Sequence, residues 1–478
     1  MSDTPIWDLI VIGGGSAGLV ASKTAANFGA RVLLIEKDRL GGDCLWTGCV
    51  PSKALISSAH VASVAARDAR LAGRERQPVD FGATMLAVQN AVLTIAPVDS
   101  KEALEAEKVS VAHGEAKFVS PRSLTLDRAE LPFRQAIIAT GTSPVIPTLE
   151  GADGLHILTS ESFWDLRVLP RELIILGGGA IGCELGQAMA RLGSHVTIVQ
   201  RGPRILPKEE GAAARVVHES LVNDGVTILT GRVAVAASSQ DGLAGTVTLD
   251  DGNSLKFDRI VAALGRRAET TPLNLRTAGV STDPSGHIRV NRSLRTDNPR
   301  IWAAGDITGM PQFTHTAGVN GSIAATNAIL GLRRNAETRV IPRVTFTSPE
   351  VAAVGIEASA ADPWNHRVIT QHHSHSDRAI AESNTTGFTQ IVVDRRGRII
   401  GGTIVGPRAG ESVGELSLAV HARLSTGSVA STIHPYPTYN DPLWNAAVID
   451  VRYRLGRGVV AAAIQLLARL RSIVTASS

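Results

Sequence analysis

The stretch DLIVIGGGSAGL, residues 8–19, decides the fold of this chain. It opens with a short apolar run typical of a buried parallel strand, and Gly13, Gly15 and Gly18 follow in the order G-x-G-x-x-G. A helix of small residues and a second apolar strand complete the unit, which ends at Glu36. This order of elements predicts a β-α-β unit that binds a dinucleotide, with Glu36 accepting hydrogen bonds from a ribose.

The same pattern occurs a second time in residues 172–199. An apolar strand leads into Gly177, Gly179 and Gly182, and a helix of small residues and another apolar strand follow. Two such fingerprints predict two bound dinucleotides. We therefore expect an enzyme that transfers electrons between two cofactors rather than a simple dehydrogenase.

The end of this second unit bears on which nicotinamide cofactor is bound. Where an acidic residue would favour NAD, the chain reads Gln200-Arg201, and Arg204 follows. An arginine at this place can pair with the 2′-phosphate of NADPH, so NADPH is favoured while NADH stays possible. The alternative is that both arginines are simply solvated.

Two cysteines follow Glu36 closely, in CLWTGCVPSK, residues 44–53. Their position beside a nucleotide-binding turn indicates a dithiol that exchanges electrons with a bound cofactor. Cys49 lies just before Pro51, a residue favoured in the first turn of a helix, so helix N-terminal amides can stabilise its thiolate. The third cysteine, Cys183, is interpreted as a buried inert thiol. No metal site is expected, because the sequence has no Cys-x2-Cys pair or histidine cluster to complete a ligand set.

Length and composition limit the class of protein. A chain of 478 residues fits about three domains, and 44% hydrophobic with 19% charged residues is globular. With only three cysteines, no secretory signal and no apolar run expected to span a membrane, we predict a cytoplasmic protein. Residues 451–478 hold five arginines and no acid, so the other 450 residues sum to −1 of the net charge of +4. The body of the chain therefore has no basic stripe of the kind that binds nucleic acid, and nucleic acid is not an expected partner.

Taken together, these motifs resemble the class I pyridine nucleotide-disulfide oxidoreductases, the flavoprotein disulfide reductases that include glutathione reductase, dihydrolipoamide dehydrogenase and mercuric reductase. Residues 41–53 are similar to the family's G-G-T-C-x-x-x-G-C-x-P-S-K, with Asp43 and Trp46 in place of its usual Thr and Asn. Four further segments are similar to family motifs: Ala139-Thr140-Gly141 and Ala304-Gly305-Asp306 of the FAD segments, Gly265-Arg266 of the NAD(P) domain, and Pro349-Glu350 of the interface domain.

The resemblance, which covers about residues 5–450, implies an α/β protein with two Rossmann-like dinucleotide-binding domains and a C-terminal α+β dimerisation domain. The expected parts are an FAD domain in two segments, 1–150 and 271–338, an NAD(P)H domain, 151–270, a dimerisation domain, 339–450, and a basic amphipathic tail, 451–478. It also implies a homodimer, because in this family the C-terminal segment works in the partner's active site.

The resemblance assigns roles to individual residues. Cys44 is expected to be the interchange thiol that attacks the substrate, and Cys49 the charge-transfer thiol that faces the flavin. Lys53 is expected near the reactive flavin nitrogen with Glu184 as its carboxylate partner, although a charge early in a helix can also be merely structural. The residues expected to hold the cofactors FAD and NADPH are Gly13, Gly15, Gly18, Glu36, Gly42, Lys53, Thr140, Gly141, Asp306, Gly177, Gly179, Gly182, Gln200, Arg201 and Gly265.

The C-terminal segment departs from the members that exchange thiols, where H-P-T-x-x-E supplies a histidine base. Aligned on its Pro-Thr, residues 434–441 place Tyr436 at the base position and Asp441 at the acid position, with His434 two residues early. A phenol is a poor base near neutral pH. Mercuric reductase has a tyrosine here, but it also delivers metal through terminal and N-terminal cysteine pairs, and these 478 residues contain neither.

The tail carries apolar residues at alternating steps of three and four: Val460, Ala463, Leu467, Leu470 and Val474. This spacing predicts an amphipathic helix with basic flanks. It could pack on its own body or a sister subunit, or lie on an anionic membrane surface.

We therefore expect an FAD-dependent oxidoreductase that passes hydride from NAD(P)H to FAD and electrons on to the Cys44–Cys49 disulfide, which reduces a small-molecule acceptor. Tyr436 and Asp441 would line the exit. A dihydrolipoamide-dehydrogenase-type enzyme, with His434 replacing the missing base, is one alternative. A redox sensor or membrane-associated partner protein that uses the tail is another.

Overall fold

The computed structural model describes residues 6–75 and 77–476. The chain divides into two compact units, one made of residues up to 205 and 224–338, the other of residues 206–223 and 339 onward. We describe each unit separately. The expected boundaries between the FAD and NAD(P)H segments lie inside the first unit and stay a prediction.

The first unit is built around a seven-stranded sheet. Its parallel part has the order β3 (Val109–His113), β2 (Val32–Glu36), β1 (Trp7–Ile12), β6 (Ala129–Ile138) and β17 (Ile301–Ala303). β5 (Ser123–Leu126) and β4 (Ala116–Ser120) extend it from β6 in antiparallel pairing. The strands are parallel and buried because helices cover the sheet, as continuous apolar runs require.

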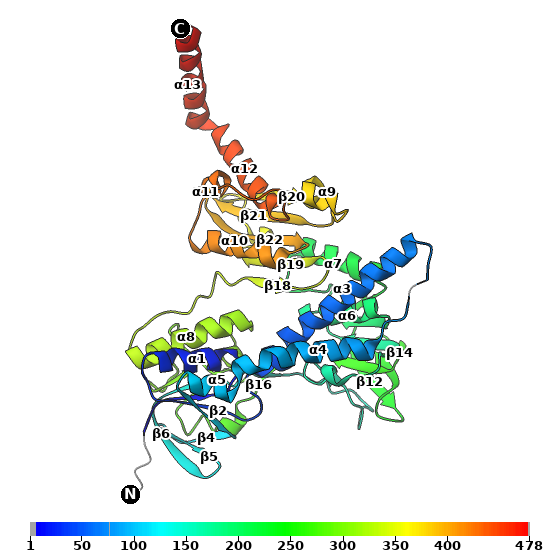
Figure 1. Ribbon diagram of the computed structural model, residues 1–478, viewed down its shortest axis with the longest axis vertical. Coiled ribbons are helices and arrows are strands. Elements are labelled where there is room, and N and C mark those ends of the chain that lie inside the picture. The colour runs from blue at the N-terminus through cyan, green and yellow to red at the C-terminus, as the bar shows by residue number, and fades with distance from the viewer. Residues whose placement is uncertain (1–5, 76, 477–478) are drawn as a thin grey trace. The chain divides into compact units, whose positions relative to one another are not determined.

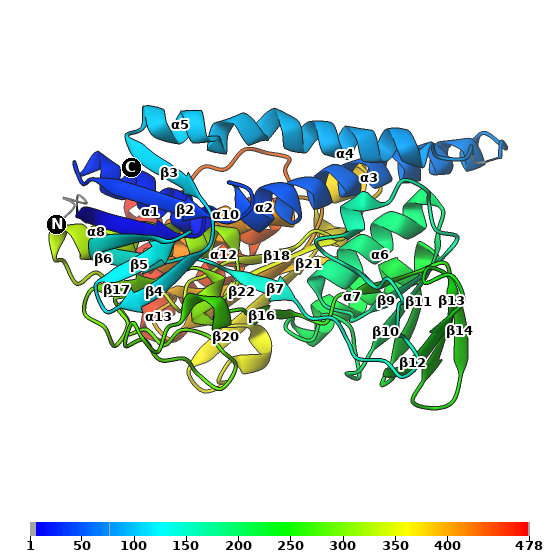
Figure 2. The same cartoon turned by 90° about the horizontal axis from the view of Figure 1, so that it is seen from below.

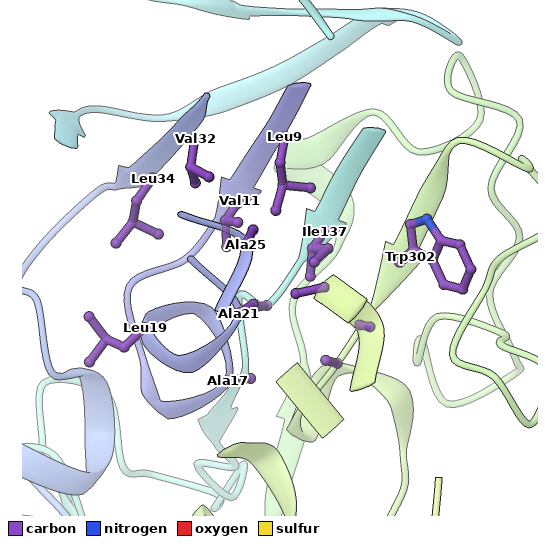
Figure 3. Close-up of a cluster of buried hydrophobic side chains, with 14 of the residues drawn as sticks. Leu9, Val11, Ala17, Leu19, Ala21, Ala25, Val32, Leu34, Ile137 and Trp302 are labelled. Carbon is purple, nitrogen blue, oxygen red and sulfur yellow. The ribbon is translucent and has the colours of Figure 1, made fainter. Parts of the chain in front are cut away.

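Two helices lie on one face of this sheet. α1 (Ser16–Asn27) and α8 (Thr314–Leu330) pack so closely that a Cβ on Gly321 would lie 2.2 Å from the carbonyl oxygen of Ala17. Figure 3 shows the alanines of α1 facing Leu9, Val11 and Ile137 of the strands. This packing fixes where the N-termini of both helices lie relative to the ends of the strands.

The first unit also contains a second parallel sheet, in the order β11 (Thr227–Thr230), β10 (His195–Gln200), β9 (Glu172–Leu176), β15 (Arg259–Ala262) and β8 (Leu158–Thr159). α6 (Ala180–Leu192) packs on it. The remaining strands are the antiparallel β12 (Ala234–Ser239), β13 (Gly245–Leu249) and β14 (Ser254–Phe257), and the pair β7 (Thr142–Pro144) and β16 (Arg266–Ala268).

The second unit has a five-stranded antiparallel sheet in the order β18 (Arg343–Thr345), β19 (Glu350–Gly355), β22 (Ile399–Gly406), β21 (Phe388–Asp394) and β20 (His366–His372). It also contains α7 (Gly211–Asn223), α9 (Asp377–Ala381), α10 (Ala409–His421), α11 (Thr426–Ser431), α12 (Asp441–Leu455) and α13 (Gly458–Ala476). The expected fold class, two Rossmann-like domains with a C-terminal α+β domain, is confirmed.

The expectation that no apolar run could span a membrane is wrong for one stretch. Within the described residues, Phe81–Ala106 has the length and mean hydropathy, 1.5, of a membrane-spanning helix. It is nevertheless α4 (Phe81–Ile95), a 3-10 turn and α5 (Lys101–Ala106), with Pro97 in the turn. α4 lies along α3 (Cys49–Leu71), as Figure 2 shows, and buries one face of its own. Length and composition alone are therefore weak evidence of a membrane span here.

Candidate active site

The glycines of the first fingerprint are required by close backbone contacts. Gly13 has φ +102°, and a Cβ there would lie 2.5 Å from the carbonyl oxygen of Ala139. A Cβ on Gly18 would lie 1.8 Å from the carbonyl oxygen of Gly13. The first contact brings the end of β6, and so Thr140 and Gly141, against the turn. Two of the predicted cofactor-binding segments thus lie together.

The second fingerprint repeats this geometry. A Cβ on Gly177 would lie 2.4 Å from the carbonyl oxygen of Ala263, and one on Gly182 would lie 2.0 Å from that of Gly177. The middle glycine differs: no described atom lies within 4 Å of a Cβ on Gly179, which caps α6. In the first fingerprint Gly15 meets only the Cα of Gly42, at 3.9 Å. Open space beside a helix N-terminus fits the diphosphate of a dinucleotide.

Equivalent side chains close the two turns. Glu36 accepts a hydrogen bond from the backbone N–H of Gly14 at 2.5 Å, and Gln200 accepts one from Gly178 at 2.9 Å. The carboxylate at the first site suits a ribose hydroxyl, whereas the neutral amide at the second does not repel a phosphate. Arg201 beside it is exposed and Arg204 is half-buried.

The dithiol lies where the short α2 (Gly42–Trp46) gives way to α3. Cys44 is in α2, and Cys49 is the first residue of α3, with both present as free thiols. The Sγ of Cys49 lies 3.2 Å from the Oγ1 of Thr314, the first residue of α8. The two cysteines are also hydrogen-bonded to each other.

These contacts separate the two thiols electrostatically. The hydrogen bond from Cys44, aided by Thr314 and the ammonium of Lys53, lowers the pKa of Cys49 to about 6 although burial opposes the shift. The same hydrogen bond, together with burial, raises the pKa of Cys44. The pair therefore holds one thiolate at Cys49 and one proton at Cys44 near neutral pH.

Lys53 and Glu184 form an ion pair between α3 and α6. The Nζ of Lys53 lies 2.9 Å from the Oε2 of Glu184, whose side chain is 9% exposed. Lys53 follows Cys49 by one helical turn, so the ammonium lies on the same side of the helix as the thiolate it stabilises. The structure thus brings together the pair that the sequence predicted.

Arg266 connects several polar groups beside the dithiol. Its guanidinium donates to the Oγ1 of Thr142 at 3.0 Å and to the Thr142 carbonyl at 2.7 Å, and lies 3.5 Å from the Oδ1 of Asp43. Thr142 in turn donates to the Oδ2 of Asp306 at 3.4 Å. Burial raises the pKa of Asp306. Hydrogen bonds from hydroxyl groups, such as those of a ribityl chain, would stabilise this carboxylate.

The two departures around the dithiol have separate explanations. Trp46 repacks the loop, because its Nε1 donates to the carbonyl of Leu40 at 2.7 Å and Arg39 lies over its ring. Asp43 accepts from the Oγ1 of Thr47 at 2.6 Å and adds a negative charge that raises the pKa of both cysteines. Trp46 is thus structural, whereas Asp43 changes the electrostatics of the thiols.

His434, in the second unit, is held by two acceptors. Its Nδ1 lies 2.9 Å from the carbonyl oxygen of Thr432 and its Nε2 lies 2.8 Å from the Oε1 of Glu415. A carbonyl and a carboxylate only accept, so both partners are satisfied together only when both ring nitrogens carry protons. Burial alone would lower the pKa of His434, but Glu415 and the Thr432 carbonyl raise it above its usual value.

Tyr436 and Asp441 do not bond to each other. The hydroxyl of Tyr436, a 70% exposed residue, donates to Asp377 of α9, which raises the pKa of the phenol. Asp441 instead accepts from the backbone N–H and the Oγ1 of Thr438, both at 3.0 Å, at the start of α12. Asp441 therefore orders the turn into the helix rather than orienting the phenol.

Sequence reasoning missed four residues of these arrangements, and Thr142, in the short strand β7, carried no motif of its own. Thr314 opens the helix after the second FAD motif, and that position was the only available signal. Glu415 and Asp377 come from helices that carry no motif, so nothing marked them. Among the described residues no three His, Cys, Asp or Glu side chains are placed to hold a metal ion.

Comparisons with known proteins agree with this geometry. The family model described as "Pyridine nucleotide-disulphide oxidoreductase" matches residues 7–321, and its dimerisation domain matches residues 341–447. A mercuric reductase from Streptomyces lividans is 33% identical over 454 residues, spanning 92% of this chain and 95% of the relative. A dihydrolipoyl dehydrogenase from Geobacillus stearothermophilus is 34% identical over 455 residues, spanning 92% and 96%.

Two solved structures are also similar. The HOCl-induced flavoprotein disulfide reductase RclA from Escherichia coli superimposes with a TM-score of 0.84 at 26% identity, over 92% of this chain and 99% of that one. LpdA from Mycobacterium tuberculosis does so with a TM-score of 0.84 at 30% identity, over 92% and 98%.

Proposed function

The chain belongs to the pyridine nucleotide-disulphide oxidoreductase family, and we propose that Cys44 and Cys49 are the redox-active pair through which it reduces a small acceptor. The protein is an FAD-dependent oxidoreductase that uses NAD(P)H, and its dimerisation domain makes it a homodimer. Because the chain is an enzyme of this family, the alternative of a non-enzymatic redox sensor is set aside. The observation that carries the proposal is the unequal pair of thiols, with the pKa of Cys49 lowered to about 6 and that of Cys44 raised.

The residues on both fingerprints fit their cofactors. Bound FAD supplies a two-electron relay between NAD(P)H and the dithiol. We assign its binding to the first glycine turn, Glu36, Gly42, the Thr140–Gly141 turn and Asp306, and the binding of NADPH to the second turn with Gln200 and Arg201. Gln200 and Arg201 support NADPH over NADH for the reason of charge given above.

The side chains around Cys49 keep its sulfur ionised. Thr314 contacts the sulfur, and Lys53 lowers the pKa of the thiolate through its charge. Glu184 holds Lys53 in place and offsets the cost of keeping an ammonium half-buried. We propose that this thiolate is the charge-transfer donor and that Cys44 is the nucleophile that meets the acceptor.

The exchange step is balanced within the dithiol. With a disulfide acceptor, the Cys44 thiol loses its proton and attacks one acceptor sulfur, forming a mixed disulfide and expelling the other sulfur as a thiolate. Cys49 then attacks Cys44, which reforms the Cys44–Cys49 disulfide and releases the second reduced sulfur. The step needs a base for the Cys44 proton and an acid for the leaving thiolate.

The C-terminal segment is poorly suited to that proton transfer. Both ring nitrogens of His434 are held by acceptors that favour the protonated ring, and Tyr436 donates to Asp377 with a raised pKa. Neither group is a free base at neutral pH. We therefore propose an acceptor that leaves no thiolate to be protonated, such as a thiophilic metal ion, in which NADPH + M²⁺ gives NADP⁺ + H⁺ + M⁰.

The proposal is tested by anaerobic NADPH titration followed by a panel of acceptors. We expect a long-wavelength charge-transfer band on two-electron reduction, lost in Cys49→Ser and kept in the matched control Cys183→Ser. Turnover with metal ions should exceed turnover with glutathione disulfide or lipoamide by at least tenfold. A preparation without the band, or with it unchanged in Cys49→Ser, overturns the assignment of the pair.

One observation keeps a dihydrolipoamide-dehydrogenase-type activity as a second candidate. His434 is paired with a carboxylate, Glu415, as a family base would be, although the carboxylate comes from α10. Steady-state assays with dihydrolipoamide and NAD decide it. A rate that is substantial and abolished by His434→Gln would support this candidate, and a negligible rate removes it.

The tail after residue 450 is proposed as a further association element. Its helix could contact its own body, a sister subunit or a membrane surface, and which of these it contacts is independent of the dithiol chemistry.

A further inference from the structure

α13 exposes apolar side chains along its length. Six large ones are between 50% and 86% exposed: Val459, Val460, Leu466, Leu467, Leu470 and Ile473. At 100° per residue these six fall within an arc of about 140°, Gln465 and Ser472 lie opposite, and Arg469 and Arg471 lie just beyond the two edges of the arc. Figure 1 shows the helix projecting beyond α12, away from the sheet of its own unit. The side chain of Val474, which completes the expected spacing, lies outside the described residues.

The charge on this segment has one sign. Residues 451–478 hold five arginines and no acid. Arg457 is already engaged, because its guanidinium lies 4.1 Å from the centroid of the Tyr453 ring. On α13 itself, Arg469 and Arg471 are exposed and form no ion pair with any described residue. The helix therefore presents a wide apolar face together with uncompensated positive charge.

Charge and apolar surface together select among the possible occupants. A second copy of the tail would cover the apolar face but would bring two sets of five arginines together without an acid between them. A nucleic acid would pair with the arginines but leave the six apolar side chains in water. An anionic phospholipid surface satisfies both, because acyl chains take the apolar face and phosphates take the guanidinium groups.

We propose that α13 lies in the headgroup region of an anionic phospholipid bilayer, with its apolar face toward the acyl chains and its arginines at the phosphates. The helix is an addition to the family domain, since the matched dimerisation domain ends at residue 447. The proposal does not depend on the acceptor of the dithiol, so membrane binding and turnover can fail separately.

The test is co-sedimentation of the full-chain, FAD-loaded enzyme with phosphatidylcholine vesicles, with and without phosphatidylglycerol. We expect partitioning only with phosphatidylglycerol, and weakening as salt rises. Leu466→Gln with Leu470→Gln, and separately Arg469→Glu with Arg471→Glu, should each lower the partition coefficient by about tenfold or more. The matched control is Arg122→Glu with Arg128→Glu, an equal charge change at exposed positions of the first unit, which should leave it unchanged.

Flavin content and NADPH-dependent turnover establish that each variant is folded. Equal binding to phosphatidylcholine alone, or an equal loss in the Arg122 and Arg128 control, would overturn the proposal. If vesicle binding is absent and the α13 variants change the mass measured by sedimentation equilibrium, a second copy is the occupant and the proposal is overturned. Tighter binding to a duplex DNA probe than to vesicles would likewise overturn it.

Discussion

The hydroxyl of Thr314 lies 3.2 Å from the sulfur of Cys49, although 265 residues separate them in the chain. The contact exists because α8 packs against α1, and it places a polar group at the start of one helix against a thiolate at the start of another. This threonine is one of the groups that lower the pKa of Cys49 to about 6.

Replacing Thr314 with Val should raise the pKa of Cys49. A hydrogen bond to a charged group contributes about 1.5–3 kcal/mol, so we expect a shift of about one unit or more toward the ordinary thiol value. The measurement is the pH dependence of the charge-transfer band after two-electron reduction. The band should already weaken near neutral pH in Thr314→Val, while Thr314→Ser keeps the wild-type profile. Identical profiles for the Val and wild-type proteins would remove Thr314 from the site.

Glu184→Gln should slow reduction of the flavin by NADPH and destabilise the fold by about 1–2 kcal/mol, because Lys53 loses its charged partner while it is half-buried. Stopped-flow absorbance follows the reductive step, and urea denaturation the stability. Lys53→Met combined with Glu184→Leu is the informative control. It should recover stability without recovering the reduction rate, since it removes both charges together. Recovery of both would make the pair purely structural.

Asp43→Thr, which restores the family's usual residue, should lower the pKa of both cysteines, because Asp43 raises them through its charge. We expect faster reaction of Cys44 with an anionic disulfide such as glutathione disulfide, by a few-fold at low salt, and a smaller gain at high salt. Asp43→Asn keeps the shape and should behave like Asp43→Thr. If only the threonine variant gains rate, shape rather than charge is the cause.

His434→Gln should show how that ring contributes to stability. The pKa of His434 is raised in the folded protein, so its contribution is fully present below the unfolded value of about 6.5 and is lost as pH rises through the folded pKa. The difference in unfolding free energy between wild type and His434→Gln should therefore be larger at pH 6 than at pH 9. Urea denaturation at both values measures it. A difference that grows with pH would mean that the ring is neutral in the folded state.

The parts of the site that could be predicted from the sequence are those fixed by local rules. Gly13 and Gly177 could be predicted because a positive φ and a close carbonyl allow no side chain at these positions. Cys49 could be predicted because it opens a helix near Pro51. Glu415 and Asp377 could not be predicted, since they meet His434 and Tyr436 only through the packing of separate helices. Tyr436 and Asp441 were matched by alignment, but Tyr436 donates to Asp377 whereas Asp441 accepts from Thr438.

Gln200→Glu should reverse the preference between nicotinamide cofactors. Gln200 accepts a hydrogen bond from Gly178 in the second turn, as Glu36 does from Gly14 in the first, so a carboxylate fits there without rearrangement. It would add negative charge where the 2′-phosphate of NADPH is expected and would offer an acceptor to the 2′-hydroxyl of NADH. We expect the ratio of kcat/KM for NADPH over NADH to fall at least tenfold, with a further fall in the double variant with Arg201→Ser, because that guanidinium is the proposed partner of the phosphate. Arg128→Ser, at an exposed arginine in the turn between β5 and β6, is the matched control and should leave the ratio unchanged. A wild-type enzyme that already prefers NADH would contradict the assignment of Arg201.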